Sequence, residues 1–281
     1  KQIDRSYFMG KLFDTIMNTM RLNGDDYEEE YEENPTIMTA ELYGKFPLIS
    51  ESTSNGNYAG NTYNEIFGTG LSFESIFELN FKENQKVSNA VLYIERQQPL
   101  YGSNSSRTGQ ISAPSYLFTD VAAGLNDYFR KTDCRYLEIM TEQNNKFYIS
   151  KYVNENVSFR TNTTTGGAPS VAASIRSGSY ANWIIYRLTD IMLMRAEASV
   201  KLAGDKQQGE TLSEEQEKNY REAFAHVIAV WKRANNKRVA NADTLKFDDY
   251  ATSSTAMEDL VLDERARELC GEYLRWFDCK R

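Results

Sequence analysis

The sequence predicts a mainly α protein in which paired helices follow an irregular, loop-rich region with a few short β-strands. Two observations support this prediction. From about Trp183 onward, apolar side chains recur at steps of three and four, the period of a helix with one buried face. Between residues 51 and 182 that period is lost, and polar loops rich in Asn, Ser, Thr and Gly separate short runs of strand-forming residues.

The composition is that of a globular protein with a net negative charge. Hydrophobic residues make up 41% of the 281 residues, and 32 Lys plus Arg stand against 40 Asp plus Glu. The formal net charge of −8 argues against nucleic acid as a partner, because such affinity comes mainly from neutralising phosphates. No apolar run approaches the roughly 18 residues of a membrane-spanning helix.

We expect one domain fragment with three stretches: a helical stretch over 1–50, a loop-rich stretch over 51–182, and helices over 183–281. Because an amphipathic helix pattern over 1–22 opens at Lys1, we expect both ends to be cuts through a longer polypeptide. The acidic run at 25–33 lacks the spacing of a calcium loop and is interpreted as a solvated helix face.

Two segments of the loop-rich stretch are predicted to form β structure. Residues 71–81, LSFESIFELNF, carry apolar residues of strand type and predict a short buried strand. Residues 136–153 have two strand-like halves around Asn144-Asn145, which predicts a hairpin.

The C-terminal stretch predicts three helices. The first runs from Trp183 to a glycine cap at Gly204, the second covers 218–235, and the third begins near Met257 and continues through Trp276. Small residues mark points of close approach between the first two helices: Ala196, Ala198, Ala223 and Ala225. This pair resembles a tetratricopeptide-like unit, although that repeat's spacing is not matched in full.

Three glutamates near the C-terminus could suggest an acid cluster. Glu264, Glu268 and Glu272 are four apart, which places them in one row on a helix. A glycosidase needs two carboxylates that face one sugar, whereas these lie along one helix among arginines. We therefore interpret this segment as a charged, partly buried helix held by Arg–carboxylate pairs.

The expected ion-pair network joins this helix to the one that begins at Trp183. Its predicted members are Arg187, Asp190, Arg195, Glu197, Glu268, Glu272 and Arg275. If the two helices pack together, Arg187 or Arg195 should contact Glu268 or Glu272. Truncating one partner would then cost several kcal/mol, because it leaves a buried charge.

The sequence offers no set of residues for metal or cofactor chemistry, and we expect neither. His226 is the only histidine and is interpreted as a core or interface residue. Cys270 and Cys279 lie nine residues apart on one predicted helix, about 13 Å at the helical rise, which is too far for a disulfide. The motifs of nucleophilic hydrolases, zinc proteases and P-loop proteins are missing.

Polar loops rich in tyrosine are the candidate binding site. Sugar sites combine aromatic faces with amide and guanidinium donors, and the loops at 51–64 and 98–116 contain these ingredients. The candidate ligand-binding residues are Tyr58, Tyr63, Tyr101, Asn104, Arg107, Tyr116 and Tyr180. The alternative, ordinary surface loops, stays open for each of them.

Two helical segments resemble those of the SusD/RagB family of outer-membrane nutrient-binding lipoproteins. WIIYRLTDIMLMRAEA is similar to the family's RLADxYLMxAEA helix, and ERARELCGEYLRWFDCKR to its ERRRELAFEGxRWFDLKR helix. Upstream, SFESIFELNF looks like the family's nsEsIFElqF segment, in the same order.

The resemblance implies a mainly α fold of tetratricopeptide-like helix pairs that support an irregular ligand-binding region. It also implies a surface-exposed, lipid-anchored outer-membrane protein that captures glycans, or in some cases peptides. Such proteins pass their ligand to a TonB-dependent transporter of the SusC type and are not enzymes. The N-terminal lipid anchor would lie outside this chain. The family's ligand residues form no transferable motif.

Two other classes of function stay open. A tetratricopeptide-like scaffold would bind a protein or peptide in a helical groove. A glycosidase would need acids that converge in the loops, such as Glu95, Asp120 or Asp133.

Overall fold

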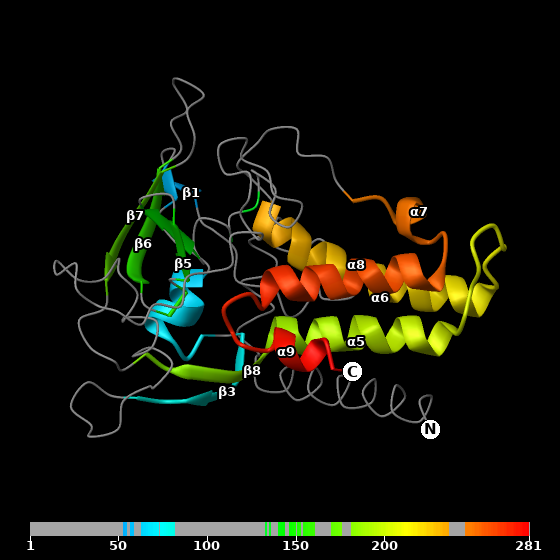
Figure 1. Cartoon of the computed structure of the whole chain (residues 1–281), viewed down its shortest axis with the longest axis horizontal. Helices are drawn as coiled ribbons and strands as arrows, with labels where there is room; N and C mark the ends of the chain where they lie inside the picture. Colours follow the sequence, from blue (N-terminus) through cyan, green and yellow to red (C-terminus); the bar gives the residue numbers. More distant parts are fainter. Residues whose placement is uncertain are drawn as a thin grey trace. The chain divides into compact units, whose positions relative to one another are not determined.

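The computed structural model describes residues 53–54, 57–58, 63–72, 74–81, 133, 135, 140–143, 146–149, 151–152, 154–160, 170–175, 181–235 and 245–280. These residues belong to two compact units, one before Leu188 and one from Leu188 onward (Figure 1). The predicted helix at 1–22 and the acidic run at 25–33 lie outside the described residues.

The first unit carries the strands. In chain order its elements are β1 (Thr53–Ser54), β2 (Asn57–Tyr58), the π-helix η2 (Asn64–Thr69), β3 (Ser75–Leu79), β4 (Met140–Gln143), β5 (Lys146–Ile149), β6 (Asn154–Arg160), β7 (Ser170–Ile175) and β8 (Trp183–Arg187). Strands β1, β2, β6 and β7 form one antiparallel sheet in that order. Strands β4 and β5 pair with Gln143 opposite Lys146, which confirms the hairpin predicted around Asn144-Asn145.

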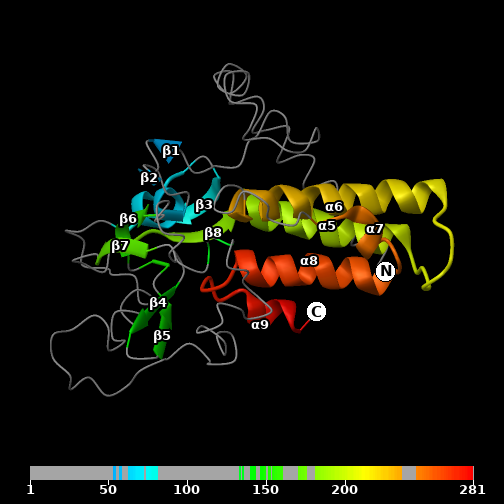
Figure 2. The ribbon, with the colours of Figure 1, turned by 90° about the horizontal axis from the view of Figure 1, so that it is seen from above.

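The second unit is helical. Its elements are α5 (Leu188–Ala203), α6 (Glu214–Asn235), α7 (Phe247–Tyr250), α8 (Ser254–Glu268) and α9 (Arg275–Asp278). Helices α5, α6 and α8 lie side by side, and each contacts the other two (Figures 1 and 2). This helix-rich architecture confirms the predicted fold class.

Small and β-branched side chains fill the core of the helical unit. Ala196 of α5 and Ala223 of α6 are fully buried, as are Val227 and Val230 of α6 and Val261 of α8. Small residues at such positions let helix backbones approach closely, and their burial supplies the main stabilising term. The alanines that the sequence marked as contact points at 196 and 223 therefore lie in the core.

Local signals define the helix ends. Gly204 has φ +74° and ends α5 as predicted, with its N–H donating to the Lys201 carbonyl at 3.3 Å. Ser253 precedes α8 in an extended conformation, and its hydroxyl accepts the Ala256 N–H at 3.1 Å. Such a cap satisfies one of the free N–H groups at the start of the helix.

The prediction of one helix from Trp183 to Gly204 is wrong in its first part. Residues Trp183–Arg187 form strand β8, which pairs antiparallel with β3, and the helix begins only at Leu188. The segment WIIYR combines aromatic and β-branched side chains, which suit a strand, and pairing with β3 outweighs its helical spacing. The strand at 71–81 is confirmed as β3, but Phe77 and Leu79 are exposed rather than buried.

The last predicted helix is broken in two. Helix α8 ends at Glu268, and Gly271 (φ +79°) and Tyr273 (φ +63°) reverse the chain before α9 begins at Arg275. Glu272 therefore lies in the turn, outside the row that Glu264 and Glu268 share. The distance predicted between Cys270 and Cys279 assumed one continuous helix, so it does not apply to this structure. Both cysteines are nonetheless free thiols.

Candidate functional site

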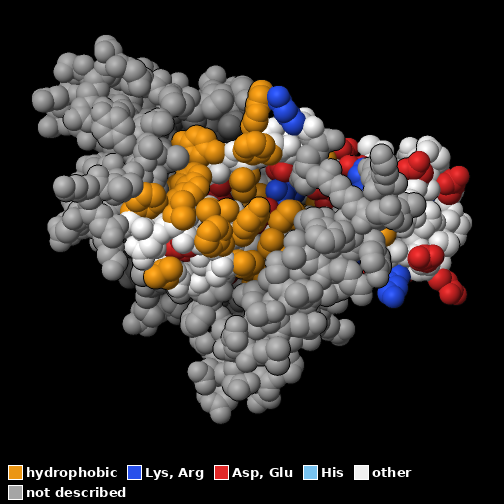
Figure 3. Space-filling model, turned by 90° about the horizontal axis from the view of Figure 1, so that it is seen from below, with side chains coloured by type: hydrophobic (Ala, Val, Ile, Leu, Met, Phe, Trp, Pro, Cys, Tyr) orange, Lys and Arg blue, Asp and Glu red, His pale blue; other side chains and the backbone are white. Residues whose placement is uncertain are grey.

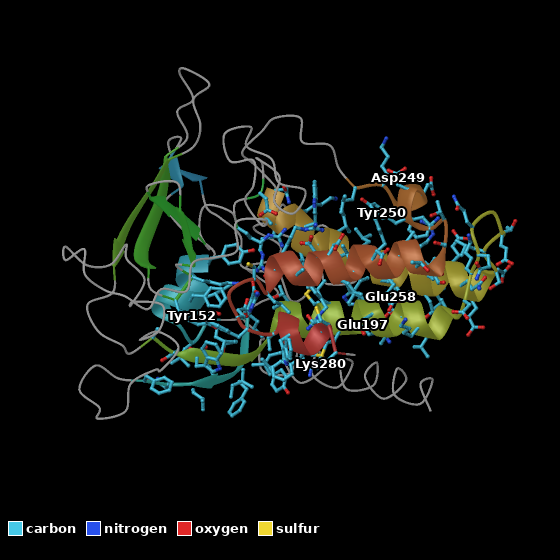
Figure 4. The ribbon with its side chains drawn as sticks, in the orientation of Figure 1. Tyr152, Glu197, Asp249, Tyr250, Glu258 and Lys280 are labelled. Atoms are coloured by element: carbon cyan, nitrogen blue, oxygen red, sulfur yellow. The ribbon has the colours of Figure 1, made fainter. Side chains whose placement is uncertain are left out.

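A buried aromatic cluster lies at the start of η2 in the first unit. Tyr63 and Phe67 stack with parallel rings whose centroids are 6.3 Å apart. Tyr152 meets Phe67 edge-on at 5.0 Å and stacks on Trp183 at 5.0 Å (Figure 4). Such aromatic pairs contribute about 0.5–1.5 kcal/mol each beyond the area they bury. The cluster thus joins η2, the segment before β6, and β8.

Two cations reinforce this cluster. The Lys151 ammonium lies 4.5 Å from the centroid of the Phe67 ring, and the Arg187 guanidinium lies 5.5 Å from it. Arg187 also faces Glu74, with 3.8 Å between the Nη1 and Oε2 atoms, and both side chains are buried. Desolvated cations over aromatic faces are attracted by the ring quadrupole. These contacts hold η2, the segment before β6 and β8 together.

Of the predicted ligand residues, the structure describes the side chain of Tyr63 alone. Tyr63 is only 3% exposed, so its ring packs in the core of the unit and offers no open face to a sugar. Tyr58 lies in β2 opposite Phe159, and its side chain lies outside what the structure describes. The remaining candidates also lie outside the described residues and stay predictions: Tyr101, Asn104, Arg107, Tyr116 and Tyr180.

A polar network fixes the turn between η2 and β3. The Glu78 carboxylate accepts the Leu71 N–H at 3.0 Å and the Ser75 hydroxyl at 2.6 Å, and it also accepts from the Asn182 amide. Gly70 (φ +74°) and Leu71 (φ +52°) adopt left-handed conformations in this turn. Because such a conformation is unfavourable for leucine, the contacts of Glu78 are needed to maintain it.

Large apolar side chains are exposed beside this turn. Phe77 and Tyr186 lie opposite each other on β3 and β8, with exposed fractions of 52% and 48%. Leu71 and Leu79 are exposed as well, and Figure 3 shows hydrophobic side chains gathered on a face of the molecule. This surface could not be predicted from the sequence, because an apolar strand pattern does not indicate which side of the strand stays open.

The ion pairs of the helical unit differ from the predicted ones. Asp190 of α5 is bound by Arg265 of α8 at 2.8 Å, and Arg265 also binds Asp278 of α9 at 3.1 Å. Glu268 is bound by Arg233 of α6. Helix α5 is therefore tied to α8, as expected. The acid of the pair lies on α5 and the arginine on α8, the reverse of the prediction.

The predicted arginines have other contacts. Arg195 contacts Glu222 of α6 at 2.6 Å, so the proposed pairing of Arg195 with Glu268 or Glu272 is wrong. Arg187 contacts Glu74 of the first unit, a partner that the sequence did not suggest. Glu197 is half-buried, Glu272 is buried in the turn, and the side chain of Arg275 lies outside the described residues. Spacing in the sequence indicates which side chains share a face of one helix. It does not define the register between two helices.

Two of the acids that the sequence offered for catalysis contact arginines in the structure. Glu264 accepts from Arg267 at 2.9 Å, and the buried Asp133 is bound by Arg135 at 2.6 Å. Glu95 and Asp120 lie outside the described residues. Within the described ranges, no group of three His, Cys, Asp or Glu side chains could hold a metal ion. No helix in that same part of the chain is long and apolar enough to cross a membrane.

Burial and neighbouring charges shift the pKa values of two groups. His226 is fully buried in α6, as predicted, and burial lowers its pKa to about 3. It is therefore neutral at physiological pH. Burial on its own would lower the pKa of Arg265, but Asp190 and Asp278 outweigh it and the pKa is raised.

The architecture is that of a mainly α protein whose paired helices accompany an irregular, strand-bearing region. A family model described as the SusD family matches residues 74–281, about three quarters of the chain. The chain belongs to the SusD family. No curated protein matches the sequence.

The chain is also similar to several solved structures. A SusD homolog from Bacteroides thetaiotaomicron is 20% identical with a TM-score of 0.44, over 96% of this chain and 47% of that one. A SusD superfamily protein from Bacteroides fragilis is 16% identical with a TM-score of 0.44, over 78% and 43%. Surface glycan-binding protein A from Bacteroides thetaiotaomicron, in complex with laminarihexaose, is 18% identical with a TM-score of 0.37, over 94% and 52%. This chain spans about half the length of these proteins.

Proposed function

We propose that this chain is part of a surface glycan-capture protein. It would bind an oligosaccharide or polysaccharide and deliver it to a TonB-dependent transporter of the SusC type in the outer membrane. The observation that carries the proposal is membership of the SusD family over residues 74–281. A lipid anchor in a part of the protein beyond this chain would hold it at the cell surface.

The local structure supports binding rather than catalysis. The three C-terminal glutamates that first suggested an acid cluster are buried in the helical unit, where Glu264 and Glu268 accept from arginines. These two carboxylates are thus engaged in ion pairs inside the helical unit. Ligand capture instead falls to the loop-rich region, whose tyrosines, amides and arginines suit the two faces of a sugar ring.

The buried cluster of Tyr63, Phe67 and Tyr152 would support these loops. It anchors the end of the loop at 51–64 to β8 and to the segment before β6. A site held on a rigid base loses less conformational entropy when it binds a ligand. Stacking and hydrogen bonds at an open surface also release ligand readily, which suits transfer to a transporter.

Affinity electrophoresis against a panel of polysaccharides, with laminarihexaose among the soluble probes for calorimetry, tests the proposal. We expect Tyr101→Ala or Tyr116→Ala to weaken retention by a retained glycan while the melting temperature stays near that of the wild type. Tyr186→Ala, which removes an exposed tyrosine on β8, is the matched control and should retain binding. Unchanged affinity of both loop variants for every retained glycan would contradict the assignment of these residues.

The peptide-binding alternative makes the opposite prediction. A scaffold that binds peptides along its helices would give hits on a peptide array and none on glycans. Co-purification with a SusC-type transporter tests delivery separately from glycan binding.

A further inference from the structure

The four-stranded sheet of the first unit brings one polar residue from each strand into a single row. Ser54 of β1 lies opposite Asn57 of β2, and Asn57 lies opposite Arg160 of β6. Arg160 in turn lies opposite Ser170 of β7. Residues directly opposite each other in an antiparallel sheet share one of its faces. The backbone register therefore assigns these four residues, which we call the polar row, to the same face.

The polar row lies at one end of the sheet. Ser54 is the last residue of β1, and Arg160 is the last residue of β6. Asn57 is the first residue of β2, and Ser170 is the first residue of β7. Neighbouring strands are about 4.8 Å apart, so the row spans roughly 14 Å, which suits a short oligosaccharide better than a single sugar. Sites built on strands also hold their residues more precisely than sites on loops.

The adjacent row of the sheet has the opposite character. It again takes one residue from each strand: Thr53, Tyr58, Phe159 and Val171. Because successive residues of a strand belong to opposite faces, this second row lies on the other face of the sheet. Alternation of this kind is the pattern of an antiparallel sheet with one face on a core and one face in water. The sheet thus has one polar and one mainly apolar face at this end.

The residue types of the polar row suit a sugar acid. The guanidinium of arginine is a planar donor that binds a carboxylate through two parallel hydrogen bonds. The asparagine amide and the serine hydroxyls both donate and accept, as sugar hydroxyl groups do. None of the four residues is acidic, so the row carries one formal positive charge, that of Arg160.

We propose that the polar row is a binding site for an oligosaccharide that contains a uronic acid. Arg160 binds the carboxylate, and Asn57 and the two serines bind hydroxyl groups of the same sugar and its neighbours. The proposal rests on the proposed glycan-capture function and names its class of ligand. The formal net charge of −8 disfavours an anionic glycan at the protein surface as a whole, so its capture requires a local site.

Isothermal titration calorimetry on the full chain tests the site with two probes, the trimers of galacturonic acid and of mannuronic acid. The methyl esters of the same trimers are the matched neutral ligands. We expect at least one trimer to bind more tightly than its ester. In Arg160→Gln the affinity for that trimer should fall at least about tenfold, because a charged hydrogen-bonded pair is lost, while the affinity for the ester changes less than about threefold.

Three further variants separate charge, geometry and folding. Arg221→Gln is the matched control, because it removes the same charge from an exposed arginine on α6 and should leave trimer binding unchanged. Arg160→Lys keeps the charge without the planar fork and should recover only part of the affinity. Asn57→Ala should weaken binding of the trimer and its ester alike. Thermal melting followed by circular dichroism distinguishes a loss of binding from a loss of folding.

Three results would overturn the proposal. Trimer binding by Arg160→Gln that equals that of Arg221→Gln would show that Arg160 does not hold the carboxylate. Equal affinity of the wild type for each trimer and its ester would exclude recognition of the acid. Binding of neither trimer would exclude a uronic acid site. In that last case, retention of other glycans would leave the proposed glycan-capture function standing, whereas retention of none would contradict both.

Discussion

Asp190 in the first turn of α5 and Arg265 in α8 are 75 residues apart in sequence, yet Oδ1 of the aspartate lies 2.8 Å from Nη1 of the arginine. Both side chains are buried. The pair joins two of the three long helices at one end of the helical unit. Its aspartate also places a negative charge in the first turn of a helix, where the helix dipole favours it.

Asp190→Asn should therefore destabilise the protein. The variant leaves the Arg265 guanidinium buried with one carboxylate instead of two, and we expect a loss of about 2–3 kcal/mol in the free energy of unfolding. Urea denaturation followed by circular dichroism measures this change. Glu217→Gln removes a carboxylate from the exposed pair of Glu217 with Arg221 and should change stability by less than about 0.5 kcal/mol. Equal effects of the two substitutions would contradict the assigned role of Asp190.

The Arg233–Glu268 pair permits a sharper test of buried charge. Both side chains are almost inaccessible to water. Glu268→Gln should cost about 3 kcal/mol, because it removes the carboxylate that pairs with the buried guanidinium of Arg233. The double variant Arg233→Met, Glu268→Leu should recover much of that loss, since it removes both charges and replaces them with apolar side chains. A double variant that is less stable than either single variant would show that the pair stabilises the fold by itself.

His226 makes stability depend on pH in a defined direction. Its pKa is lowered to about 3 in the folded protein, whereas an unfolded histidine titrates near 6.5. The unfolded state therefore binds a proton first, so the stability contributed by neutral His226 is present above pH 6.5 and is lost as pH falls toward 3.

We expect this histidine to contribute a slope of about 1.4 kcal/mol per pH unit between roughly pH 6 and pH 4. His226→Leu should remove that slope and give a flatter profile in the same window. The measurement is urea denaturation at a series of pH values for both proteins. Parallel profiles would mean that His226 becomes protonated in the folded state without penalty.

Much of the helical unit could be predicted from the sequence. Steps of three and four located α5, α6 and α8, Gly204 marked the end of α5, and Asn144-Asn145 marked a hairpin turn. These signals are local, because each depends on residues within one or two helical turns or on a two-residue turn. The isolated His226 was also correctly assigned to the core.

Features that depend on distant contacts could not be predicted. WIIYR has helical spacing, and only its pairing with β3 makes it a strand. The roles of Arg233 and Arg265 depend on the register between helices, which spacing along a single helix does not define. The break after Glu268 was signalled only by Gly271, because nothing in the sequence around Tyr273 marks its left-handed conformation. Within the candidate site, burial of Tyr63 follows from its contacts with Phe67 and Lys151, which no local pattern reveals.

Gly70 and Gly204 offer a matched pair for separating backbone strain from steric crowding. Both have φ +74°, so an alanine at either position adopts the same unfavourable conformation. A Cβ atom at Gly70 would lie 2.6 Å from Nδ2 of Asn182 and 2.8 Å from Oε1 of Glu78, whereas nothing lies within 4 Å of one at Gly204.

We expect Gly204→Ala to cost about 1–2 kcal/mol from strain. Gly70→Ala should cost about 1–3 kcal/mol more, because it displaces the carboxylate that accepts the Leu71 N–H. Urea denaturation gives the two costs, and faster hydrogen exchange at Leu71 in Gly70→Ala alone would locate the difference. Equal costs in the two variants would show that the Glu78–Asn182 contact yields without loss and does not hold the turn.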